Sequence, residues 1–301
     1  MKACVIFNPT AQGDKARRFR DHLAELGGGV ALKPTTAAGH GRVLAAEAVS
    51  EGFDTLVAAG GDGTVNEVLN GLGDAPEGFA RARLAVLPLG TVNVFARELG
   101  LPLTLAAAWQ VALHGRERAV DLPRVEFTAA GRPQRRYFAQ MAGAGLDVHA
   151  IELMDWSEKK RIGKLAYVLA GLHALRGPLP QIRCESDHGA ASGQQVLIGN
   201  GRFYGGSLPV FHQASLTDGL LDACVFPRAT LGTTLRYAIG YVCGRVFPPR
   251  DLAYFQAPRF TVSCAVPARF ELEGDVVGEL PATFSVVPRG LRVMVENGVV
   301  E

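Results

Sequence analysis

The sequence contains few cysteines and no long apolar run. Its five cysteines are odd in number and far apart, at Cys4, Cys184, Cys224, Cys243 and Cys264. Because no C-x-x-C pair occurs among them, neither a disulfide framework nor a zinc knuckle is indicated, and a reducing cytosol fits best. No run of about 18 apolar residues exists, and Asn8-Pro9 interrupts the apolar start too early for a signal peptide. We therefore expect a cytoplasmic protein without a membrane span.

The sequence also has little net charge. Its 31 lysines and arginines are balanced by 29 aspartates and glutamates, which gives a net charge of +2 and a pI near 8.3. This balance argues against a nucleic-acid-binding protein that relies on bulk positive charge. The P-loop and G-x-S-x-G signatures are absent as well, which disfavours P-loop kinases and serine hydrolases. With 301 residues, the chain has room for two domains.

What the sequence does contain is a predicted strand, glycine turn and helix within TLVAAGGDGTVNEVLNGL. The strand is Thr55–Ala59, the turn is Gly60–Gly63, and the helix is predicted from Thr64, which stands in capping-box register with Glu67. Three glycines before a helix N-terminus suit a phosphate group. Asp62 would repel phosphate unless a metal ion or a proton lay between them, which indicates Mg²⁺-nucleotide chemistry. An ordinary βα turn is the alternative.

Strands alternate with helices through the first 122 residues. Strands are predicted at Ala3–Phe7, Val30–Leu32, Thr55–Ala59 and Leu84–Leu87, and helices near Arg17–Leu23, at Gly41–Ser50, from Thr64 and at Thr104–Leu113. This alternation predicts a parallel sheet with ligand sites at the carboxyl ends of its strands. We therefore predict an α/β nucleotide-binding domain over residues 1–122.

Short β-type segments with turns between them dominate from about residue 123 onward. They are Arg118–Phe127, Arg136–Ala142, Ile182–Glu185, Gln195–Gly199, Leu221–Phe226, Phe260–Cys264, Arg269–Leu272, Ala282–Val287 and Leu291–Val295. Such a density of strands predicts a second, mainly antiparallel domain over residues 123–301, a β-sandwich or an open barrel.

One segment of the second half, Met154–Arg176, joins a basic cluster to an apolar run. The cluster consists of Lys159, Lys160, Arg161 and Lys164, and the apolar run is Leu165–Leu175. This combination suits a helix on an anionic lipid surface. A helix that covers the sheet of the second domain, with its lysines in solvent, explains the pattern at least as well.

Two glycine motifs carry a resemblance to a known family. GGDGTVNEVLNGL resembles the nucleotide-binding signature of the diacylglycerol kinase and sphingosine kinase superfamily, whose GGDGT core is shared with NAD kinases. PLGTVNVFAR, which starts at Pro88, is similar to that family's second motif, P-x-G-T-x-N-x-x-A-R, although Val94 stands where many members have Asp.

The resemblance implies that ATP is bound by residues of these motifs and of the N-terminal turns. They are Asn8, Thr35, Gly60, Gly61, Asp62, Gly63, Thr64, Asn66, Glu67 and Thr91. A helix cap is the alternative role of Thr91. Turn formation explains Asn8 and Thr35 about equally well.

A third motif, Asp218-Gly219-Leu220-Leu221-Asp222, resembles the family's D-G-x-L-D segment. In bacterial members this segment holds a structural Mg²⁺, and by position the resemblance implies Ser215, Asp218 and Leu220 as the ligands. Asp-Gly is also a common turn pair, so a simple turn is the alternative.

A fourth motif, Glu273-Gly274-Asp275, resembles the D-G-E segment of bacterial members, with both acids exchanged. The glutamate of that segment is assigned as the catalytic base. Asp275 occupies its position but is one methylene shorter, and Glu273 would lie on the same side if the segment were extended. Asp62 is the rival base, because the aspartate of the glycine motif has this role in the sphingosine kinase branch. A solvated hairpin explains the acid pair as well.

The four motifs together predict an ATP- and Mg²⁺-dependent lipid kinase that phosphorylates a lipid alcohol, such as diacylglycerol or a sphingoid lipid. Asp62 and Asp275 would bind metal or accept the proton. The resemblance further implies a peripheral position at the inner membrane surface and a homodimer, and no nucleic-acid partner is expected. One alternative is an NAD kinase. The other is a nucleotide- or lipid-binding regulatory protein with little kinase activity, which the exchange of the two acids motivates.

Overall fold

The computed structural model describes residues 1–10, 14–21, 30–153, 174, 177–232, 236 and 252–298. They form two compact units. Unit 1 comprises Met1–Leu122, Tyr137–Ala139 and Val287–Glu301, and unit 2 comprises Pro123–Arg136 and Gln140–Val286. The chain therefore enters unit 1 three times. Of the predicted basic and apolar helix Met154–Arg176, all but Ala174 lies outside the described residues.

Unit 1 alternates strands and helices along the chain. Its elements are β1 (Ala3–Phe7), α1 (Asp14–Asp21), β2 (Ala31–Pro34), α3 (His40–Ser50), β3 (Thr55–Gly60), α4 (Asp62–Asp74), α5 (Gly78–Arg81), β4 (Arg83–Pro88), α6 (Val94–Glu98) and α7 (Leu105–His114). Two longer strands, β5 (Arg116–Ala129) and β18 (Ala282–Val295), have residues in both units. The sheet of unit 1 runs in the order β2-β1-β3-β4-β18 with parallel neighbours, which confirms the predicted α/β class.

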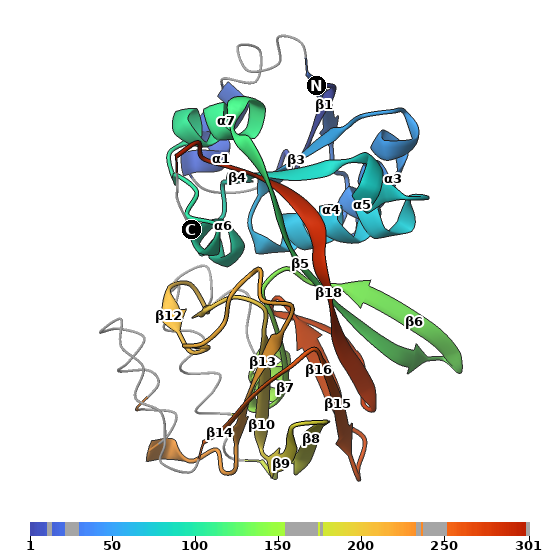
Figure 1. Ribbon diagram of the computed structural model, residues 1–301, viewed down its shortest axis with the longest axis vertical. Coiled ribbons are helices and arrows are strands. Elements are labelled where there is room, and N and C mark those ends of the chain that lie inside the picture. Colours follow the sequence, from blue (N-terminus) through green and yellow to red (C-terminus); the bar gives the residue numbers. More distant parts are fainter. Residues whose placement is uncertain are drawn as a thin grey trace. The chain divides into compact units, whose positions relative to one another are not determined.

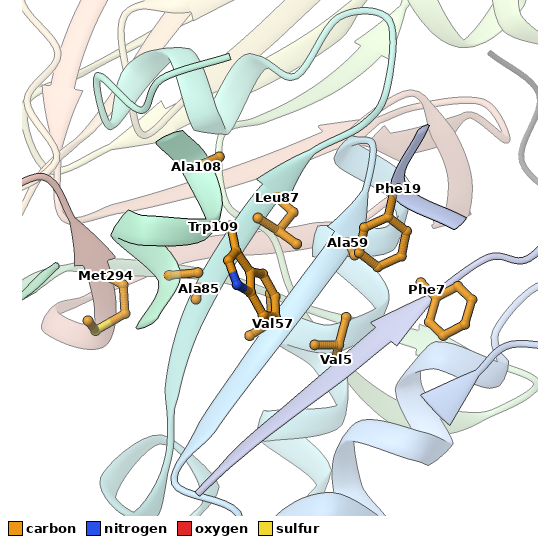
Figure 2. Close-up of a cluster of buried hydrophobic side chains, with 11 residues drawn as sticks. Val5, Phe7, Phe19, Val57, Ala59, Ala85, Leu87, Ala108, Trp109 and Met294 are labelled. Carbon is orange, nitrogen blue, oxygen red and sulfur yellow. The ribbon is translucent and has the colours of Figure 1, made fainter. Parts of the chain in front are cut away.

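The sheet of unit 1 is covered on both faces. Side chains alternate between the faces along each strand, and Val5, Val57 and Ala85 share one face with Trp109 of α7 and Met294 of β18 (Figure 2). Helices α3 and α4 lie on the opposite face (Figure 1). Every residue of β1 and of β3 is buried, as expected for central parallel strands.

Unit 2 is built mainly from antiparallel strands. Its further elements are β6 (Arg132–Tyr137), β7 (Met141–Gly145), α8 (Leu146–Glu152), β8 (Ile182–Ser186), β9 (Gly189–Gly193), β10 (Gln195–Gly199), β11 (Phe203–Tyr204), β12 (Leu208–Pro209), β13 (Leu221–Phe226), β14 (Ala253–Ala257), β15 (Arg259–Cys264), β16 (Arg269–Leu272) and β17 (Asp275–Glu279). One sheet has the order β14-β13-β10-β7-β16-β17, and in the other β15 pairs with β18 and β8.

Aromatic side chains join the two sheets of unit 2. The ring of Phe270 in β16 lies edge-on to Phe127 of β5, with centroids 5.1 Å apart, and to Phe284 of β18, with centroids 5.7 Å apart. Phe270 and Phe284 are both almost fully buried. The β-sandwich predicted for the second half is confirmed.

In two places the structure divides the chain into strands differently from the prediction. Arg136–Ala142, predicted as one strand, contains the end of β6 and the start of β7. Two segments predicted as separate strands, on either side of the turn-like Pro288-Arg289-Gly290, form the single strand β18. Arg289 has a φ of 51°, and its N–H donates to Asp121 Oδ1 at 2.7 Å, so the irregularity is contained within the strand instead of reversing the chain.

Candidate active site

Strands of unit 1 end together at one edge of the sheet. Phe7 at the end of β1 pairs with Pro34 of β2 and Ala59 of β3, and Gly60 of β3 pairs with Pro88 of β4. The loops after these strands therefore begin side by side. The strand order also reverses between β1 and β3, and doubly wound folds bind ligands at the carboxyl edge beside such a point.

Residues predicted to bind nucleotide follow three of these strand ends directly. Asn8 follows β1, and its Oδ1 accepts hydrogen bonds from the N–H and the hydroxyl of Thr10 at 2.9 and 2.8 Å. Thr35 follows β2, and its N–H donates to the carbonyl of Phe7 at 2.8 Å. Gly61 follows β3. The turn role of Asn8 is thus present, whereas the N–H of Thr35 continues the pairing of β2 with β1. The roles of both residues in binding stay predictions.

Close backbone packing explains two of the glycines in these loops. A Cβ on Gly60 would lie 2.2 Å from the Thr64 hydroxyl oxygen, and a Cβ on Gly90 would lie 2.5 Å from the Gly61 α-carbon. The glycine turn after β3 and the loop after β4 are therefore in direct backbone contact. A Cβ on Gly63 would meet nothing within 4 Å, so no packing in the described part of the chain requires that glycine.

Helix α4 begins at Asp62, two residues before the predicted start at Thr64. Its N-cap residue is Gly61, and no side chain makes a capping hydrogen bond there. The predicted capping box of Thr64 and Glu67 is therefore wrong. Gly61 has no side chain that could accept the first N–H groups of α4, and such groups at a helix start attract anions.

Glu67 supports the neighbouring helix instead. Its Oε1 accepts the N–H of Gly39 at 2.8 Å, and its Oε2 accepts the N–H of Gly41 at 2.7 Å. These two groups lie at the start of α3, whose N-cap residue, Gly39, also makes no side-chain cap. A carboxylate from α4 thus caps α3 across 28 and 26 residues of chain.

Asp62 lies partly buried in the first turn of α4. Its Oδ1 accepts the N–H of Phe95 in α6 at 3.3 Å. Burial raises the pKa of the Asp62 carboxyl, and the backbone N–H groups of Phe95, Val94 and Asn93 oppose that shift. Asp62 therefore connects the glycine turn to the second motif.

The second motif forms a tight loop before α6. Asn93 has a left-handed conformation (φ 53°) and is the N-cap residue, so the alternative role of Thr91 as the cap is wrong. Asn93 Nδ2 donates to the carbonyls of Pro88 at 3.3 Å and Gly90 at 2.6 Å. Thr91 itself is exposed. The shape of this loop thus depends on the side-chain amide of Asn93. Asn93 is part of the second motif but was not among the residues predicted to bind ATP.

Asn66 is engaged within α4. Its main-chain carbonyl and its Oδ1 both accept from Asn70 Nδ2 at 2.9 Å. The same Nδ2 donates to the carbonyl of Tyr137, and Asn70 Oδ1 accepts the N–H of Tyr137 at 3.0 Å. Both of these hydrogen bonds to Asn66 lie within α4. The role of Asn66 in binding nucleotide stays a prediction.

The predicted metal ligands of unit 2 lie in the loop before β13. Leu220 N–H donates to Asp218 Oδ1 at 2.9 Å, and the Ser215 hydroxyl lies 3.4 Å from that of Thr217. Asp218 is exposed, and Ser215 and Leu220 are partly buried. A carboxylate, a hydroxyl and main-chain carbonyls form an oxygen donor set of the kind that Mg²⁺ prefers.

The fourth motif is a tight hairpin between β16 and β17. Glu273 and Gly274 have φ values of 54° and 91°, and Leu272 pairs with Asp275 across them. Positive φ at both central residues is typical of a type I′ turn. The expectation that Glu273 and Asp275 lie on one side of an extended segment is therefore wrong, because the chain reverses between them.

The two acids of this hairpin have different surroundings. Glu273 Oε1 accepts the N–H groups of Gln140 at 2.7 Å and Met141 at 3.4 Å, at the start of β7. Asp275 is exposed and is the first residue of β17. Glu273 therefore joins the turn to the neighbouring strand, and Asp275 is the more accessible acid.

A third acid of the same segment, Glu271, was not among the predicted site residues. It is fully buried in β16, and Asp147 of α8 lies close to it. The run FEL carries no signal of this burial, because alternation along a strand places Glu271 on the face opposite Phe270 and Leu272, where an acid is expected to be exposed.

The chain forms a parallel sheet with two glycine loops in contact at its carboxyl edge, and an antiparallel β-sandwich follows. This is the architecture that the sequence motifs predict for a nucleotide-binding kinase. The family model described as "Diacylglycerol kinase catalytic domain" matches residues 2–125. The model described as "YegS C-terminal NAD kinase beta sandwich-like domain" matches residues 140–295. The chain therefore belongs to the diacylglycerol kinase family of lipid kinases.

Individual relatives agree over nearly the whole chain. "Diacylglycerol kinase" of Bacillus subtilis (strain 168) is 30% identical over 97% of this chain and 96% of its own. "Probable lipid kinase YegS-like" of Pseudomonas aeruginosa (strain UCBPP-PA14) is 35% identical over 98% and 94%. A crystal structure of a diacylglycerol kinase from Bacillus anthracis str. Sterne shares the fold, with a TM-score of 0.74 and 24% identity over 99% and 98% of the two chains.

Membership of this family makes the protein a kinase and implies that it uses a nucleotide. Within the described residues, no helix is long and apolar enough to cross a membrane. The same residues contain no group of three or more histidine, cysteine, aspartate or glutamate side chains that could hold a metal ion.

Proposed function

We propose that the protein transfers the γ-phosphate of ATP to the hydroxyl of a lipid alcohol, with Mg²⁺ bound. The observation that carries this proposal is the contact of Gly61 with Gly90 at the carboxyl edge of the unit 1 sheet. It brings the two motif loops of a lipid kinase family together where α/β sheets bind ligands. Phosphoryl transfer requires mainly positioning and neutralisation of charge, and the loops offer both.

The phosphates of ATP are proposed to bind at the start of α4. The N-cap residue of this helix, Gly61, has no side chain to accept the first N–H groups, and the helix dipole adds positive potential there. The open space beside Gly63 lets a phosphate approach the backbone closely. Thr64 and Thr91 add hydroxyl groups on the two loops.

Asp62 is proposed to act on the Mg²⁺ that accompanies the nucleotide. Asp62 lies in the first turn of α4, beside the proposed phosphate position, and its Oδ1 is held by the N–H of Phe95, so that the carboxylate can serve a metal ion or a metal-bound water. When bound there, Mg²⁺ supplies the positive charge that lets a carboxylate and a phosphate occupy one site.

Asp275 is proposed as the base that accepts the proton of the lipid hydroxyl. A base must come within hydrogen-bond reach of that hydroxyl, and Asp275 is exposed whereas Glu273 is bound to two backbone N–H groups. Ser215, Asp218 and Leu220 are proposed to hold a second, structural Mg²⁺, because they offer hard oxygen donors. The domain division at residue 122, a peripheral position at the inner membrane surface and a homodimer complete the proposal.

The first test is to incubate the protein with labelled ATP, Mg²⁺ and mixed micelles that carry a panel of lipid alcohols, with NAD in a parallel tube. Label in an organic-soluble product supports the proposal and names the lipid. Label in NADP favours an NAD kinase, and measurable ATP binding without transfer favours a regulatory protein.

Three variants separate the acids in the same assay. We expect Asp62→Asn to lower kcat by at least a hundredfold and Asp275→Asn to lower it by a factor of 10²–10⁴, the range for loss of a general base. Glu273→Gln keeps an oxygen acceptor for the N–H of Gln140 and serves as the matched control, with activity within a few-fold of the parent. Full activity of Asp275→Asn would contradict its role as the base.

A further inference from the structure

Two carboxylates of unit 2 face the same point, that of Glu271, which is fully buried, and that of Asp147, which is partly buried. A Cβ on Gly143 of β7 would lie 2.6 Å from Glu271 Oε1 and 3.1 Å from Asp147 Oδ2. Both oxygens therefore border one small space beside the Gly143 α-carbon. A larger residue at this position would collide with Glu271 Oε1 and crowd Asp147 Oδ2.

Few groups neutralise this pair. Tyr204 O–H lies 2.9 Å from each carboxylate oxygen of Asp147, and Gly274 N–H donates to Glu271 Oε2 at 2.6 Å. Glu271 Oε1 is buried and has no hydrogen-bond partner among the described residues. No lysine, arginine or histidine of the described part makes a hydrogen bond or an ion pair with Asp147 or Glu271.

The charged groups around Glu271 are acids. Its own hairpin contributes Glu273 and Asp275, and α8 contributes Asp147, all of which raise the pKa of Glu271 in addition to its burial. On the same elements, Arg269 of β16 is paired with Glu152 of α8 at 2.9 Å. Two negative charges in such a place would be very costly.

We infer that Asp147 and Glu271 together carry a single negative charge, with the proton on Glu271, and that the neutral Glu271 positions the turn at Glu273–Gly274 from which Asp275 begins β17. Asp147 holds the charge because it has the Tyr204 hydroxyl, whereas Glu271 has one backbone donor and an oxygen without a partner. Glu271 acts through Gly274 N–H and is a positioning residue, not a catalytic one.

The pair makes stability depend on pH with a defined sign. Burial and the neighbouring acids raise the pKa of Glu271 well above its ordinary value of 4.5, and burial raises that of Asp147 from 3.8 to about 6. A carboxyl whose pKa is higher in the folded chain binds more protons when folded, so stability falls as pH rises between the unfolded and folded values. For Glu271 the fall begins near pH 4.5 and continues up to its raised pKa in the folded chain.

Infrared spectroscopy of the full chain tests the proton directly. At pH 7 we expect a C=O stretching band from a protonated carboxyl group that is lost in Glu271→Gln and unchanged in Glu279→Gln, an exposed acid of the same hairpin. Absence of the Glu271-dependent band at pH 7 would overturn the inference. This measurement needs no substrate, so it can succeed even if the lipid kinase assay fails.

Thermal unfolding across pH tests the linkage. We expect the Tm of Glu271→Gln to fall less than that of the parent from pH 4.5 to 9, so that the difference between them grows with pH. Glu279→Gln should follow the parent. A constant difference across this range would contradict a raised pKa of Glu271 in the folded chain.

The positioning role rests on the proposed function and is tested by activity. Glu271→Gln keeps an acceptor for Gly274 N–H, and we expect kcat within threefold of the parent at pH 7 and less loss of kcat at alkaline pH. Glu271→Leu is of similar size without an acceptor and should lower kcat at least tenfold with an unchanged KM for ATP. Equal kcat values for the Gln and Leu variants would overturn the positioning role.

Discussion

The glycines of the GGDG motif are explained by different physical causes. Gly60 is required because Thr64 packs against it, whereas a Cβ on Gly61 would make only an ordinary contact, 3.4 Å from the Gly90 α-carbon. Gly63 borders open space, and no positive φ is found there. A glycine that neither packing nor backbone conformation demands is best explained by a ligand that comes close to it.

Two alanine substitutions in this motif distinguish a glycine that packing requires from one that ligand binding requires. Gly63→Ala should raise the free energy of unfolding by about 0.5–1 kcal/mol, because alanine favours the helix, while it weakens ATP binding. Gly60→Ala should lower the free energy of unfolding by about 1–3 kcal/mol, because its methyl group collides with Thr64. Thermal unfolding and ATP titration of both variants check this. Unchanged ATP affinity of Gly63→Ala would contradict a phosphate at that position.

Helices α3 and α4 are joined by unequal contacts. The Glu67 carboxylate accepts two backbone N–H groups at the start of α3, and Arg42 and Asp74 form an ion pair of 2.5 Å between the two helices. The ion pair is partly exposed, and such pairs contribute about 0–1 kcal/mol. Hydrogen bonds to a charged group contribute about 1.5–3 kcal/mol each, and of the two bonds to Glu67 one is exposed and one is partly buried.

Glu67→Ala should therefore destabilise the protein more than Asp74→Ala does. We expect losses of about 2–4 kcal/mol and below about 1 kcal/mol, respectively, in urea unfolding. The larger loss follows because the N–H groups of Gly39 and Gly41 lose their acceptor. If the two variants were equally stable, Glu67 would not support α3, and its predicted role in nucleotide binding would gain weight.

The sequence predicted elements better than the partners of polar side chains. The predicted boundaries of β10, β13 and β16 agree with the structure, because each of these apolar runs is bounded by turn residues. Strands such as GAASG in β9 and AYFQA in β14 were missed, since they lack alternation. The hydrogen bond from Gln140 to Glu273 spans 133 residues, so nothing local in E-G-D reveals that one acid supports β7.

The division of the chain is a property of the whole molecule. Unit 1 includes Tyr137–Ala139 and the C-terminal segment from Val287 in addition to the first 122 residues. Val293 of β18 pairs with Leu84 of β4, and Met294 lies in the core beside Trp109 (Figure 2). A fragment that stops at Leu122 would leave β4 without this neighbour.

We expect the fragment of residues 1–122 to unfold at a lower temperature than the full chain and to bind ATP more weakly. Joining residues 287–298 to it through a flexible linker should restore much of the loss, because β18 again covers β4. Circular dichroism and ATP titration of both fragments check this. A stable fragment 1–122 with full ATP affinity would support a simple boundary at residue 122.

The position of β18 in the sequence also determines when the sheet of unit 1 can be completed during translation. Residues 1–122 of unit 1 are synthesised before unit 2, yet Leu291–Val295 of the same sheet are synthesised after it. At about 5–20 residues per second, on the order of ten seconds or more separate Leu122 from β18. During that interval the edge of β4 lacks its partner while the sandwich is being made. The nascent nucleotide-binding unit thus waits until unit 2 has been translated, and products truncated before β18 expose the edge of β4 to chaperones and proteases.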